Sequence, residues 1–505
     1  MTQLPADSQD EQPQTFAAID LGSNSFHMIV CRLSDGDLQV EDKLREMVRL
    51  GAGLDARRVL DEETQERALA CLERFGQRLR GIHPTRIRAV GTNTLRTARN
   101  APEFLARAEQ ALGQPIEIIA GTEEARLIYL GVAHSTGADT SRRFVMDIGG
   151  GSTELIVGEG FEPLYMQSLY MGCVSFTRAH FGDGCITAKA VKRAELAALV
   201  ELEPVQNAYR NMGWERALGA SGTIRAIREV VQAEGWCKEG ISLKALKALR
   251  EALLTAGHID QLQLKGLSAE RAPVFPGGVM VLLATFKALG IGQMQVSDGA
   301  LREGLIHDLL GRVSHEDVRS RAVGNLAKRY HVDTPHAERV AETAGRLLAQ
   351  VAGAWNLDPE EGLQWLGWAA QLHEIGLDIA HSGYHKHGAY IAEFADLAGF
   401  SRQEQLVLAC LIRNHRRKIS SSSFKRISAY RVHATRHWMV LLRLAVLLHR
   451  SRDLEAPPEP QLKPGEDKLK LSFPKDWLQR HQLTRTDLEL EADYLQAAGF
   501  SLKFA

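Results

Sequence analysis

The chain has 505 residues, of which 45% are hydrophobic, 24% charged and 6% aromatic. This composition is typical of a soluble globular protein, and it excludes collagen-like, disordered and disulfide-scaffold classes. At roughly 150 residues per domain, the length predicts about three or four domains. No apolar run comes near the ~18 to 20 residues that span a bilayer. There are 61 Lys and Arg against 62 Asp and Glu, so the net charge indicates no polyanionic partner, although the distribution of charge does.

The chain begins with a polar segment, residues 1–15, which has neither a basic start nor an apolar core. We therefore expect a disordered tail and no signal peptide. The six cysteines lie far apart and form no CxxC pair, which predicts buried thiols in a reducing cytosol.

An apolar strand that ends in Asp and turns through Gly and Ser occurs twice, within residues 16–32 and 144–157. When Asp20 is aligned with Asp147, the matched positions are Gly22 with Gly149, Ser25 with Ser152, Ile29 with Ile156 and Val30 with Val157. The repeat predicts an internal duplication and two related α/β domains that face each other. A polar segment at residues 134–143 is a plausible hinge between them.

Helical and strand patterns alternate up to about residue 310, and from about residue 314 the pattern changes to long helices. The first half is expected to contain a helix at 62–80, a strand at 87–90, a helix at 101–112, a strand at 116–119 and a helix at 123–132. The predicted divisions are a tail at 1–15, α/β domains at 16–135 and 136–312, a helical domain at 313–460 and a small α+β unit at 461–505.

The two glycine turns are candidate phosphate sites, because successive backbone N–H groups in such a turn converge on one point. A single turn of this kind would be read as a hairpin, but a matched pair favours phosphate binding. The adjacent Asp20 and Asp147 could hold a divalent cation directly or through water. The loop positions are Gly22, Ser23, Asn24 and Ser25, and Gly149, Gly150, Gly151 and Ser152.

Glu154 follows Asp147 by an odd number of residues, so regular pleating would place the two carboxylates on opposite faces. The intervening glycine turn resets that phase, and the pair could then share one Mg²⁺. A solvent-facing carboxylate on an edge strand is an equally good interpretation from sequence alone.

Three further segments carry polar groups after a strand. Glu123 and Glu124 open a helix, where the dipole favours acids without any function, although a water-activating base could sit there. Residues Thr92, Asn93 and Arg96 supply hydroxyl, amide and guanidinium donors, and Ser221 and Gly222 precede a helix whose N-terminus could bind an anion. Each segment alone is explained as well by a tight turn or a helix cap.

The C-terminal region carries most of the histidines among helical patterns. Metal binding in a helical domain is expected of a His…His-Asp…Asp pattern, but here Glu374 stands at the paired position and Val446 where a closing Asp would be expected. A catalytic metal site is therefore not predicted. The histidines concerned are His336, His373, His381, His385, His387 and His415.

Residues 410–450 contain ten Lys or Arg and neither Asp nor Glu. Such a run attracts polyanions by counterion release, and the absence of acids argues against a merely solvated helix face. Nucleic acid, acidic lipid and polyphosphate are all possible, although the scarcity of aromatic residues weakens the case for stacked single strands. The residues of the expected anion channel are Arg413, Arg416, Arg417, Lys418, Lys425 and Arg426.

Together these segments resemble the exopolyphosphatase and guanosine pentaphosphate phosphohydrolase family, in the actin-like and sugar kinase superfamily. The matching segments are FAAIDLGSNSFH (16–27), GTNTLR (91–96), GTEEAR (121–126), DIGGGSTE (147–154), MGCVS (171–175), GASGT (219–223), SDGALRE (297–303) and AAQLHEIG (369–376). The resemblance implies two actin-like, ribonuclease H-like domains with a cleft between them, followed by a degenerate helical His-Asp-type domain. It covers nearly the whole chain.

The resemblance also implies roles. Glu124 matches the family's water-activating base, Asp147 and Glu154 match acids that bind Mg²⁺, and Asp20 joins them as a third candidate ligand. We expect hydrolysis of the terminal phosphate of inorganic polyphosphate, an exopolyphosphatase activity, with the basic C-terminal region holding the rest of the chain. The alternatives are a guanosine pentaphosphate 5′-phosphohydrolase, an enzyme with both activities, and a non-catalytic regulator that binds polyanions or nucleotides.

Further expectations follow from the same resemblance and charge pattern. The partners would be polyphosphate or guanosine pentaphosphate rather than nucleic acid, and the chain would form a homodimer. We expect a cytoplasmic location, with peripheral contact at the inner face of the cell membrane as a further option.

Overall fold

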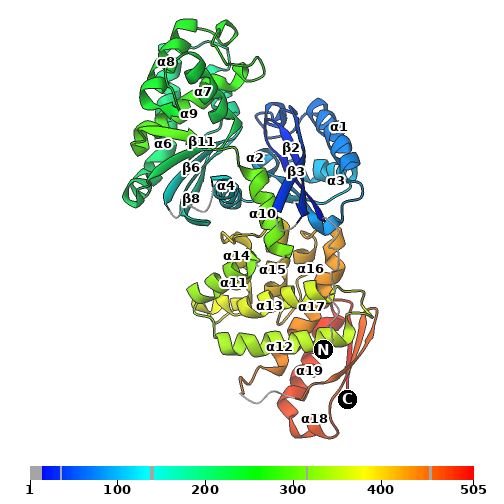
Figure 1. Cartoon of the computed structure of the whole chain (residues 1–505). Coiled ribbons are helices and arrows are strands. Elements are labelled where there is room, and N and C mark those ends of the chain that lie inside the picture. Colours follow the sequence, from blue (N-terminus) through cyan, green and yellow to red (C-terminus); the bar gives the residue numbers. More distant parts are fainter. Residues whose placement is uncertain (1–13, 35–36, 137–140, 314–316, 454–457) are drawn as a thin grey trace, which may run out of the picture. The chain divides into compact units, whose positions relative to one another are not determined.

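The computed structural model describes residues 14–34, 37–136, 141–313, 317–453 and 458–505, in two compact units, Met1–Glu316 and Asp317–Ala505 (Figure 1). Of the predicted tail, residues 1–13 lie outside the described residues, and strand β1 begins at Gln14. The predicted hinge is helical up to Thr136 and extended from Arg142, and residues 137–140 between them lie outside the description.

The first sheet has five strands in the order β3-β2-β1-β4-β5. Strand β2 pairs antiparallel with β1 and β3, whereas β4 pairs parallel with β1 and β5. The strands are β1 (Gln14–Leu21), β2 (Phe26–Ser34), β3 (Asp37–Glu46), β4 (Ile87–Gly91) and β5 (Ile116–Ile118). Residues Ala17 and Ile19 of β1 pack in one core with helices α1 (Glu62–Arg78) and α3 (Ala101–Leu112), and Phe16 and Ala18 face a second core.

The second sheet repeats this arrangement. Its strands run in the order β8-β7-β6-β9-β11-β10, which matches the first sheet strand for strand and adds one edge strand. They are β6 (Arg142–Ile148), β7 (Thr153–Glu159), β8 (Glu162–Leu169), β9 (Arg216–Gly219), β10 (Ile241–Ser242) and β11 (Gln293–Val296). Its helices are α5 (Cys173–Phe181), α6 (Ala188–Met212), α7 (Gly222–Ala233), α8 (Leu243–Ala256) and α9 (Phe275–Leu289). The predicted internal duplication is confirmed.

Two helices lie between the sheets, α4 (Gly121–Thr136) and α10 (Leu301–Val313) (Figure 1). Their backbones touch where they cross, because a Cβ on Gly131 would lie 2.0 Å from the carbonyl oxygen of Ala300 and one on Gly304 would lie 1.8 Å from that of Leu127. Both helices bury apolar side chains in a core that also takes residues from both sheets. The crossing therefore joins the two halves of the first unit.

A buried ion-pair network holds the same crossing. Asp308 of α10 accepts from Arg88 of β4 at 2.6 Å, from Arg312 at 3.0 Å and from Arg126 of α4. Burial alone would raise the pKa of Asp308, but these three guanidinium groups outweigh burial and hold the pKa well below its ordinary value. Arg126 in turn holds Glu123 through two bonds, of 2.7 and 2.8 Å.

Helix α9 corrects the expectation that no apolar run is long enough to cross a bilayer. Residues 272–289 reach the length and apolar composition of a membrane span. However, 78% of this window is buried inside the unit, where α9 packs against α5, α6 and α8. In this structure the segment is a core helix.

The second unit combines helices with a three-stranded sheet. The helices are α11 (Val318–Arg329), α12 (Thr334–Val351), α13 (Pro359–Leu372), α14 (Tyr384–Phe394), α15 (Arg402–Asn414), α16 (Ser421–Phe424), α17 (Ala429–Leu448), α18 (Trp477–Arg480) and α19 (Gln482–Gln496). The strands are β12 (Gln461–Gly465), β13 (Lys468–Ser472) and β14 (Ser501–Phe504).

The small α+β unit expected at residues 461–505 has the predicted element types, but it is not packed by itself. Leu471 and Leu488 belong to the same hydrophobic core as Leu348 and Trp438 of the helices. Arg443 of α17 is buried and donates to Glu491 of α19, which ties the two parts further.

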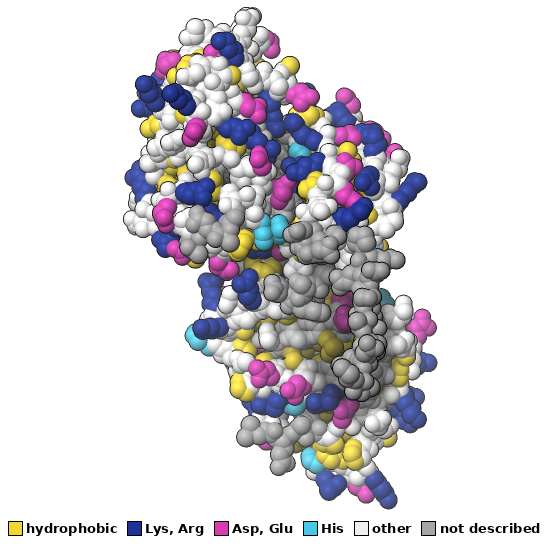
Figure 2. All heavy atoms as spheres, viewed as in Figure 1, with side chains coloured by type: hydrophobic (Ala, Val, Ile, Leu, Met, Phe, Trp, Pro, Cys, Tyr) yellow, Lys and Arg dark blue, Asp and Glu magenta, His cyan; other side chains and the backbone are white. Residues whose placement is uncertain are grey.

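Positive and negative side chains are interspersed over the face of the molecule shown in Figure 2, in keeping with the net charge of −1. All six cysteines are free, as the sequence predicted. Cys185 and Cys237 are half-buried, however, whereas the other four are buried.

The helix crossing makes a stability prediction. Gly304→Ala places a methyl group within 1.8 Å of a backbone carbonyl, so we expect the first unit to lose about 1–3 kcal/mol of unfolding free energy. Gly324→Ala is also within a helix, but among the described residues the added carbon would meet no atom within 4 Å apart from the adjoining backbone of its own helix, so this variant should gain about 0.5–1 kcal/mol instead. Denaturant unfolding followed by hydrogen exchange in each unit separates the two effects. Equal stability of the two variants would contradict the crossing.

Candidate active site

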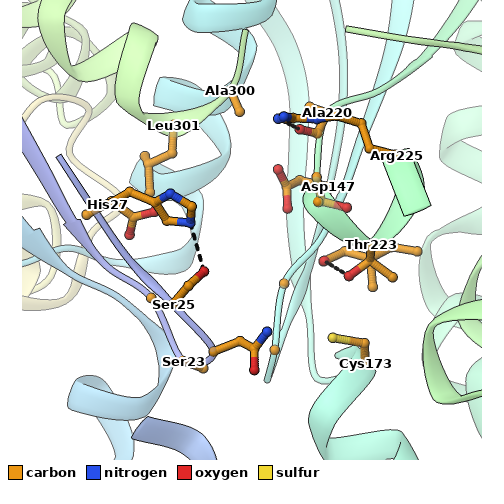
Figure 3. Close-up of a pocket in the computed structure, with 18 of the residues that line it drawn as sticks. Ser23, Ser25, His27, Asp147, Cys173, Ala220, Thr223, Arg225, Ala300 and Leu301 are labelled. Atoms are coloured by element: carbon orange, nitrogen blue, oxygen red, sulfur yellow. Dashed lines mark hydrogen bonds between the residues drawn. The ribbon is translucent and has the colours of Figure 1, made fainter. Parts of the chain in front are cut away.

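The two glycine turns contact each other, and both line one cavity. A Cβ on Gly150 would lie 2.8 Å from that of Ser23, and one on Gly151 would lie 2.2 Å from Asn93 Oδ1. Figure 3 shows Ser23, Ser25 and His27 of the first α/β domain facing Asp147, Cys173 and Thr223 of the second. Asp147 lies on β6, Cys173 begins α5 and Thr223 lies in the first turn of α7. The cavity between them measures about 410 Å³.

Most residues expected to bind phosphate line this cavity. They are Gly22, Ser23, Asn24, Ser25, Thr92, Asn93, Gly149, Gly150, Gly151, Ser152, Ser221 and Gly222. Arg96 does not line it, but its Nη1 donates to Glu124 Oε2 at 2.8 Å and to the carbonyl oxygen of Ile119 at 2.8 Å. Arg96 is therefore placed to orient Glu124.

The structure distinguishes the two adjacent glutamates that open α4. Glu124 lines the cavity, whereas Glu123 is buried and accepts from Arg126, which belongs to the ion-pair network around Asp308. The helix dipole alone does not explain this division, since both residues stand in the first turn. Of the two, Glu124 is the one with access to a ligand.

Asp147 and Glu154 lie directly opposite each other on the antiparallel strands β6 and β7. Directly paired residues point to the same face of a sheet, so the glycine turn does reset the pleat as the sequence allowed. Glu154 is 1% exposed, with Oε1 accepting from Ser168 Oγ at 2.8 Å. The alternative of an exposed edge carboxylate is wrong.

Burial and neighbouring carboxylates raise the pKa values of Asp20, Asp147 and Glu154. Burial raises the pKa of Asp20 to about 8, and Glu124 and Asp147 add to the rise while Arg302 opposes it. Burial, with Glu124 second, raises the pKa of Asp147 to about 7. The pKa of Glu154 is raised well above its ordinary value by burial, Glu124 and Asp147.

This donor set fits a hard divalent cation, which would restore the charge that burial disfavours. Among the described residues, Asp20 Oδ1 and Glu154 Oε2 are buried without a hydrogen-bond partner. The cleft acids do not form a ready-made cage, since the described residues that bring three ligand atoms within 4.8 Å of one another are elsewhere, at His336, His373 and Glu374. Mg²⁺ commonly uses one or two carboxylates and takes its other ligands from water and phosphate.

Sequence reasoning missed the cationic side of the cavity, which is lined by Arg45, Arg225, Arg271 and Arg302. Arg271 Nη2 lies 2.3 Å from where a Cβ on Gly222 would be, close to the N-terminus of α7. Three of these arginines lie outside the quoted motifs, and Arg302 is within SDGALRE without having been assigned a role. No periodicity or spacing could have found them.

His27 was also missed as a site residue, although it closes the first motif. It is the counterpart of Glu154, because it pairs with Asp20 on the first hairpin as Glu154 pairs with Asp147 on the second. Ser25 Oγ lies 2.8 Å from its Nε2 (Figure 3). Arg302 Nη1 lies 3.3 Å from its Nδ1. Burial and the neighbouring arginines lower the pKa of His27 to about 3, so the ring is neutral.

The basic run of the second unit is only in part a channel. Arg413, Arg416, Arg417 and Lys418 line a cavity of about 660 Å³ in the described structure, together with His381 and Lys386. Lys425 and Arg426 are not part of its lining.

Acids from other parts of the sequence neutralise much of the run, which corrects the expectation of an unopposed basic field. Arg426 donates to both oxygens of Glu393, at 2.6 and 3.0 Å. Arg443 pairs with Glu491, and Arg450 with Asp487.

Comparison with known proteins identifies the family. The model of the Ppx/GppA phosphatase family matches residues 29–313, and the model of domain III of the same family matches residues 318–492. The chain belongs to the Ppx/GppA phosphatase family. Its two sheet domains are actin-like, followed by the family's helical domain III with a small sheet.

Relatives and solved structures agree with this assignment. A guanosine-5′-triphosphate,3′-diphosphate pyrophosphatase of Vibrio cholerae is 43% identical over 498 residues, or 98% of this chain and 99% of that protein. The protein of the same name from Vibrio vulnificus is 41% identical over 495 residues, covering 98% and 99%. The solved Aquifex aeolicus PPX-GPPA enzyme has a TM-score of 0.50 and 26% identity, covering 59% of this chain and 100% of that one. An exopolyphosphatase from Cytophaga hutchinsonii, at 24% identity and a TM-score of 0.54, covers 59% and 98% and shows the same fold.

The raised pKa of Asp20 makes a stability prediction. Its folded pKa of about 8 lies above the ordinary 3.8, so the folded state binds the extra proton between these values, and stability falls as pH rises through that window. Asp20→Asn removes this loss, so the variant should exceed wild type in unfolding free energy at pH 8, with a smaller difference at pH 4.

The measurement is denaturant unfolding in a chelator at both pH values, repeated with Mg²⁺. Mg²⁺ should stabilise wild type more than the variant, because it offsets the charge on Asp20. A pH dependence shared by both proteins would show that the Asp20 carboxyl does not titrate as its burial requires.

Proposed function

We propose that the chain removes the terminal 5′ phosphate of guanosine pentaphosphate, releasing orthophosphate and guanosine tetraphosphate. The observation that carries the proposal is the full-length identity of 43% to a guanosine-5′-triphosphate,3′-diphosphate pyrophosphatase. The first reading of the sequence, an exopolyphosphatase, has less support, because its main argument was the unopposed basic run. The phosphatase chemistry is common to both readings.

The cavity suits a nucleotide with two separate phosphate groups. The facing glycine turns offer backbone amides to one polyphosphate end, and Arg45, Arg225 and Arg271 add cationic groups to the lining. Arginine is well suited to phosphate because its guanidinium donates two parallel hydrogen bonds. A substrate with a 5′-triphosphate and a 3′-diphosphate could use both sets of donors.

In the proposed reaction, water attacks the terminal phosphorus in line with the bridging oxygen that leaves. Glu124 orients this water and accepts its proton, while Arg96 holds the Glu124 carboxylate at 2.8 Å. The amides of the two turns stabilise charge on the equatorial oxygens. The leaving group is a nucleotide phosphate, which is a stable anion and needs little help from an acid.

Asp147, Glu154 and Asp20 are the residues that would hold Mg²⁺. When bound there, the ion would supply further charge neutralisation at the phosphate. The role of each carboxylate is part of the proposal.

Removing the base gives a direct test of this chemistry. Glu124→Gln should lower turnover by about 10²- to 10⁴-fold, with substrate binding retained, because the amide cannot accept the proton from water. Glu123→Gln is the matched control, since Glu123 stands in the same helical turn and binds Arg126 instead of facing the cavity. It should affect stability more than turnover. Near-normal turnover of a folded Glu124→Gln protein would refute the assignment.

Hydrolysis of long-chain polyphosphate is a second candidate, favoured by the basic cavity of the second unit. A long polyanion would contact several of its basic residues at once, whereas a nucleotide in the cleft needs none of them. The two substrates therefore predict different dependence on salt, because each phosphate contact adds a salt-dependent increment.

Phosphate release from guanosine pentaphosphate and from long polyphosphate, measured side by side with and without Mg²⁺, tests the proposal. We expect efficient, Mg²⁺-dependent release from guanosine pentaphosphate. Arg416→Glu combined with Arg417→Glu should weaken binding of polyphosphate and flatten its salt dependence while leaving the nucleotide reaction unchanged. Release from polyphosphate alone would overturn the proposed substrate, and release from neither would favour a non-catalytic regulator.

A further inference from the structure

Three potential metal ligands meet in the second unit, and none of them is a residue of the cleft. His336 stands in the first turn of α12, and His373 and Glu374 follow the end of α13. One ligand atom from each lies within 4.8 Å of the other two, and no other described group of three does this. The sequence pattern lacks the expected aspartates and predicted no catalytic metal site here, but the fold brings these three side chains together.

The two imidazoles present unused nitrogen atoms. His373 is 1% exposed and its Nδ1 lies 2.6 Å from the carbonyl oxygen of Ala370. A ring nitrogen this close to a carbonyl carries the proton, which leaves Nε2 with a lone pair. Among the described residues, His373 Nε2 and His336 Nδ1 are buried without a hydrogen-bond partner. A buried polar atom without a partner is costly, and a bound cation would satisfy such a nitrogen.

The arrangement around His373 is that of a metal ligand. A histidine that binds a metal through one nitrogen almost always donates its other N–H to a carbonyl or carboxylate, which fixes the tautomer.

Glu374 supplies the anionic ligand. Arg452 Nη2 donates to its two oxygens at 2.7 and 2.8 Å, and Arg452 Nη1 donates to Asp333 Oδ2 at 2.9 Å. These bonds orient the carboxylate, and each carboxylate oxygen retains a second lone pair for a cation. Asp333 offsets the charge of Arg452, so the guanidinium adds no uncompensated positive charge to the site.

We propose that His336, His373 and Glu374 form a binding site for a first-row transition-metal dication such as Zn²⁺. Two imidazoles and one carboxylate are a known three-ligand set for Zn²⁺, with water in the fourth position, whereas Mg²⁺ prefers oxygen ligands throughout. The ion would link α12 to the end of α13. This site is independent of the cleft and of the substrate that the cleft takes.

The test uses the full chain after removal of metals with a chelator. Zn²⁺ is added in a competition titration with a chromophoric chelator, and Co²⁺ is added separately to read ligand geometry from its visible absorption. We expect one tight equivalent of Zn²⁺ per chain and the intense Co²⁺ bands of a four-coordinate site. The midpoint temperature of thermal unfolding of the second unit should rise when Zn²⁺ is added.

Variants assign that equivalent to the three residues. His373→Gln and Glu374→Gln keep side-chain volume close to wild type, and each should weaken Zn²⁺ binding at least 10-fold and remove the Co²⁺ bands. His381→Ala is the matched control, because His381 is an exposed histidine outside the cluster and its loss should change neither readout. Glu374 is partly exposed, so its variant is the one expected to fold in any case.

Tight Zn²⁺ binding that survives both ligand variants would overturn the proposal, and so would the absence of any tight equivalent in wild type. Phosphate release in Mg²⁺ should persist in the Glu374→Gln protein. This activity separates loss of the Zn²⁺ site from failure of the cleft chemistry.

Discussion

The backbone contact between α4 and α10 is the constraint on which the catalytic half of this protein depends. Two glycines, Gly131 and Gly304, let the helices cross with no side chain between them. The buried carboxylate of Asp308 in α10 also binds Arg126 of α4 and Arg88 of β4. Because Glu124 stands in the first turn of α4, the crossing also fixes the position of that carboxylate between the two sheets.

The electrostatics of the cleft follow from bringing two duplicated hairpins together. Each hairpin carries one Asp at the end of its first strand, and α4 adds a glutamate between them. Burial and the neighbouring carboxylates raise the pKa values of Asp20 and Asp147, so these two groups ionise less readily without a cation. The duplication has diverged at one informative position, where the second hairpin places Glu154 and the first places the neutral His27.

Charge in the second unit is organised differently. No acid interrupts the basic run in the sequence, but acids from distant helices pair with some of its arginines, such as Arg426 and Arg443. Four other basic residues of the run line a cavity. A separate interior in the same unit collects histidines, with His415 lying edge to face on His373 at 5.2 Å. Its Nε2 is a further buried nitrogen without a partner among the described residues. The domain has therefore kept an imidazole-rich interior although Glu374 and Val446 depart from the metal-binding pattern.

The sequence by itself determined the features that are local in the chain. The Asp-Gly-Ser turns, the duplication and the approximate positions of helices α1, α3 and α4 were predictable, because a strand, a turn and a helix depend on neighbouring residues and on hydrophobic periodicity. Helix α3 was predicted at residues 101–112 and is observed at Ala101–Leu112. The resemblance of ordered motifs then led to Glu124, which spacing alone could not separate from Glu123.

Tertiary structure decided everything that depends on residues meeting from distant segments. It placed Asp147 and Glu154 on one face and brought Arg45, Arg225 and Arg271 into the cleft. It also neutralised part of the basic run with acids such as Glu393 and Glu491. It also brought His336 to His373 and Glu374. Strand register, ion pairing and ligand geometry depend on distances between residues in space. Packing between helices and strands sets these distances, and the sequence contains no local pattern that shows which distant segments will pack together.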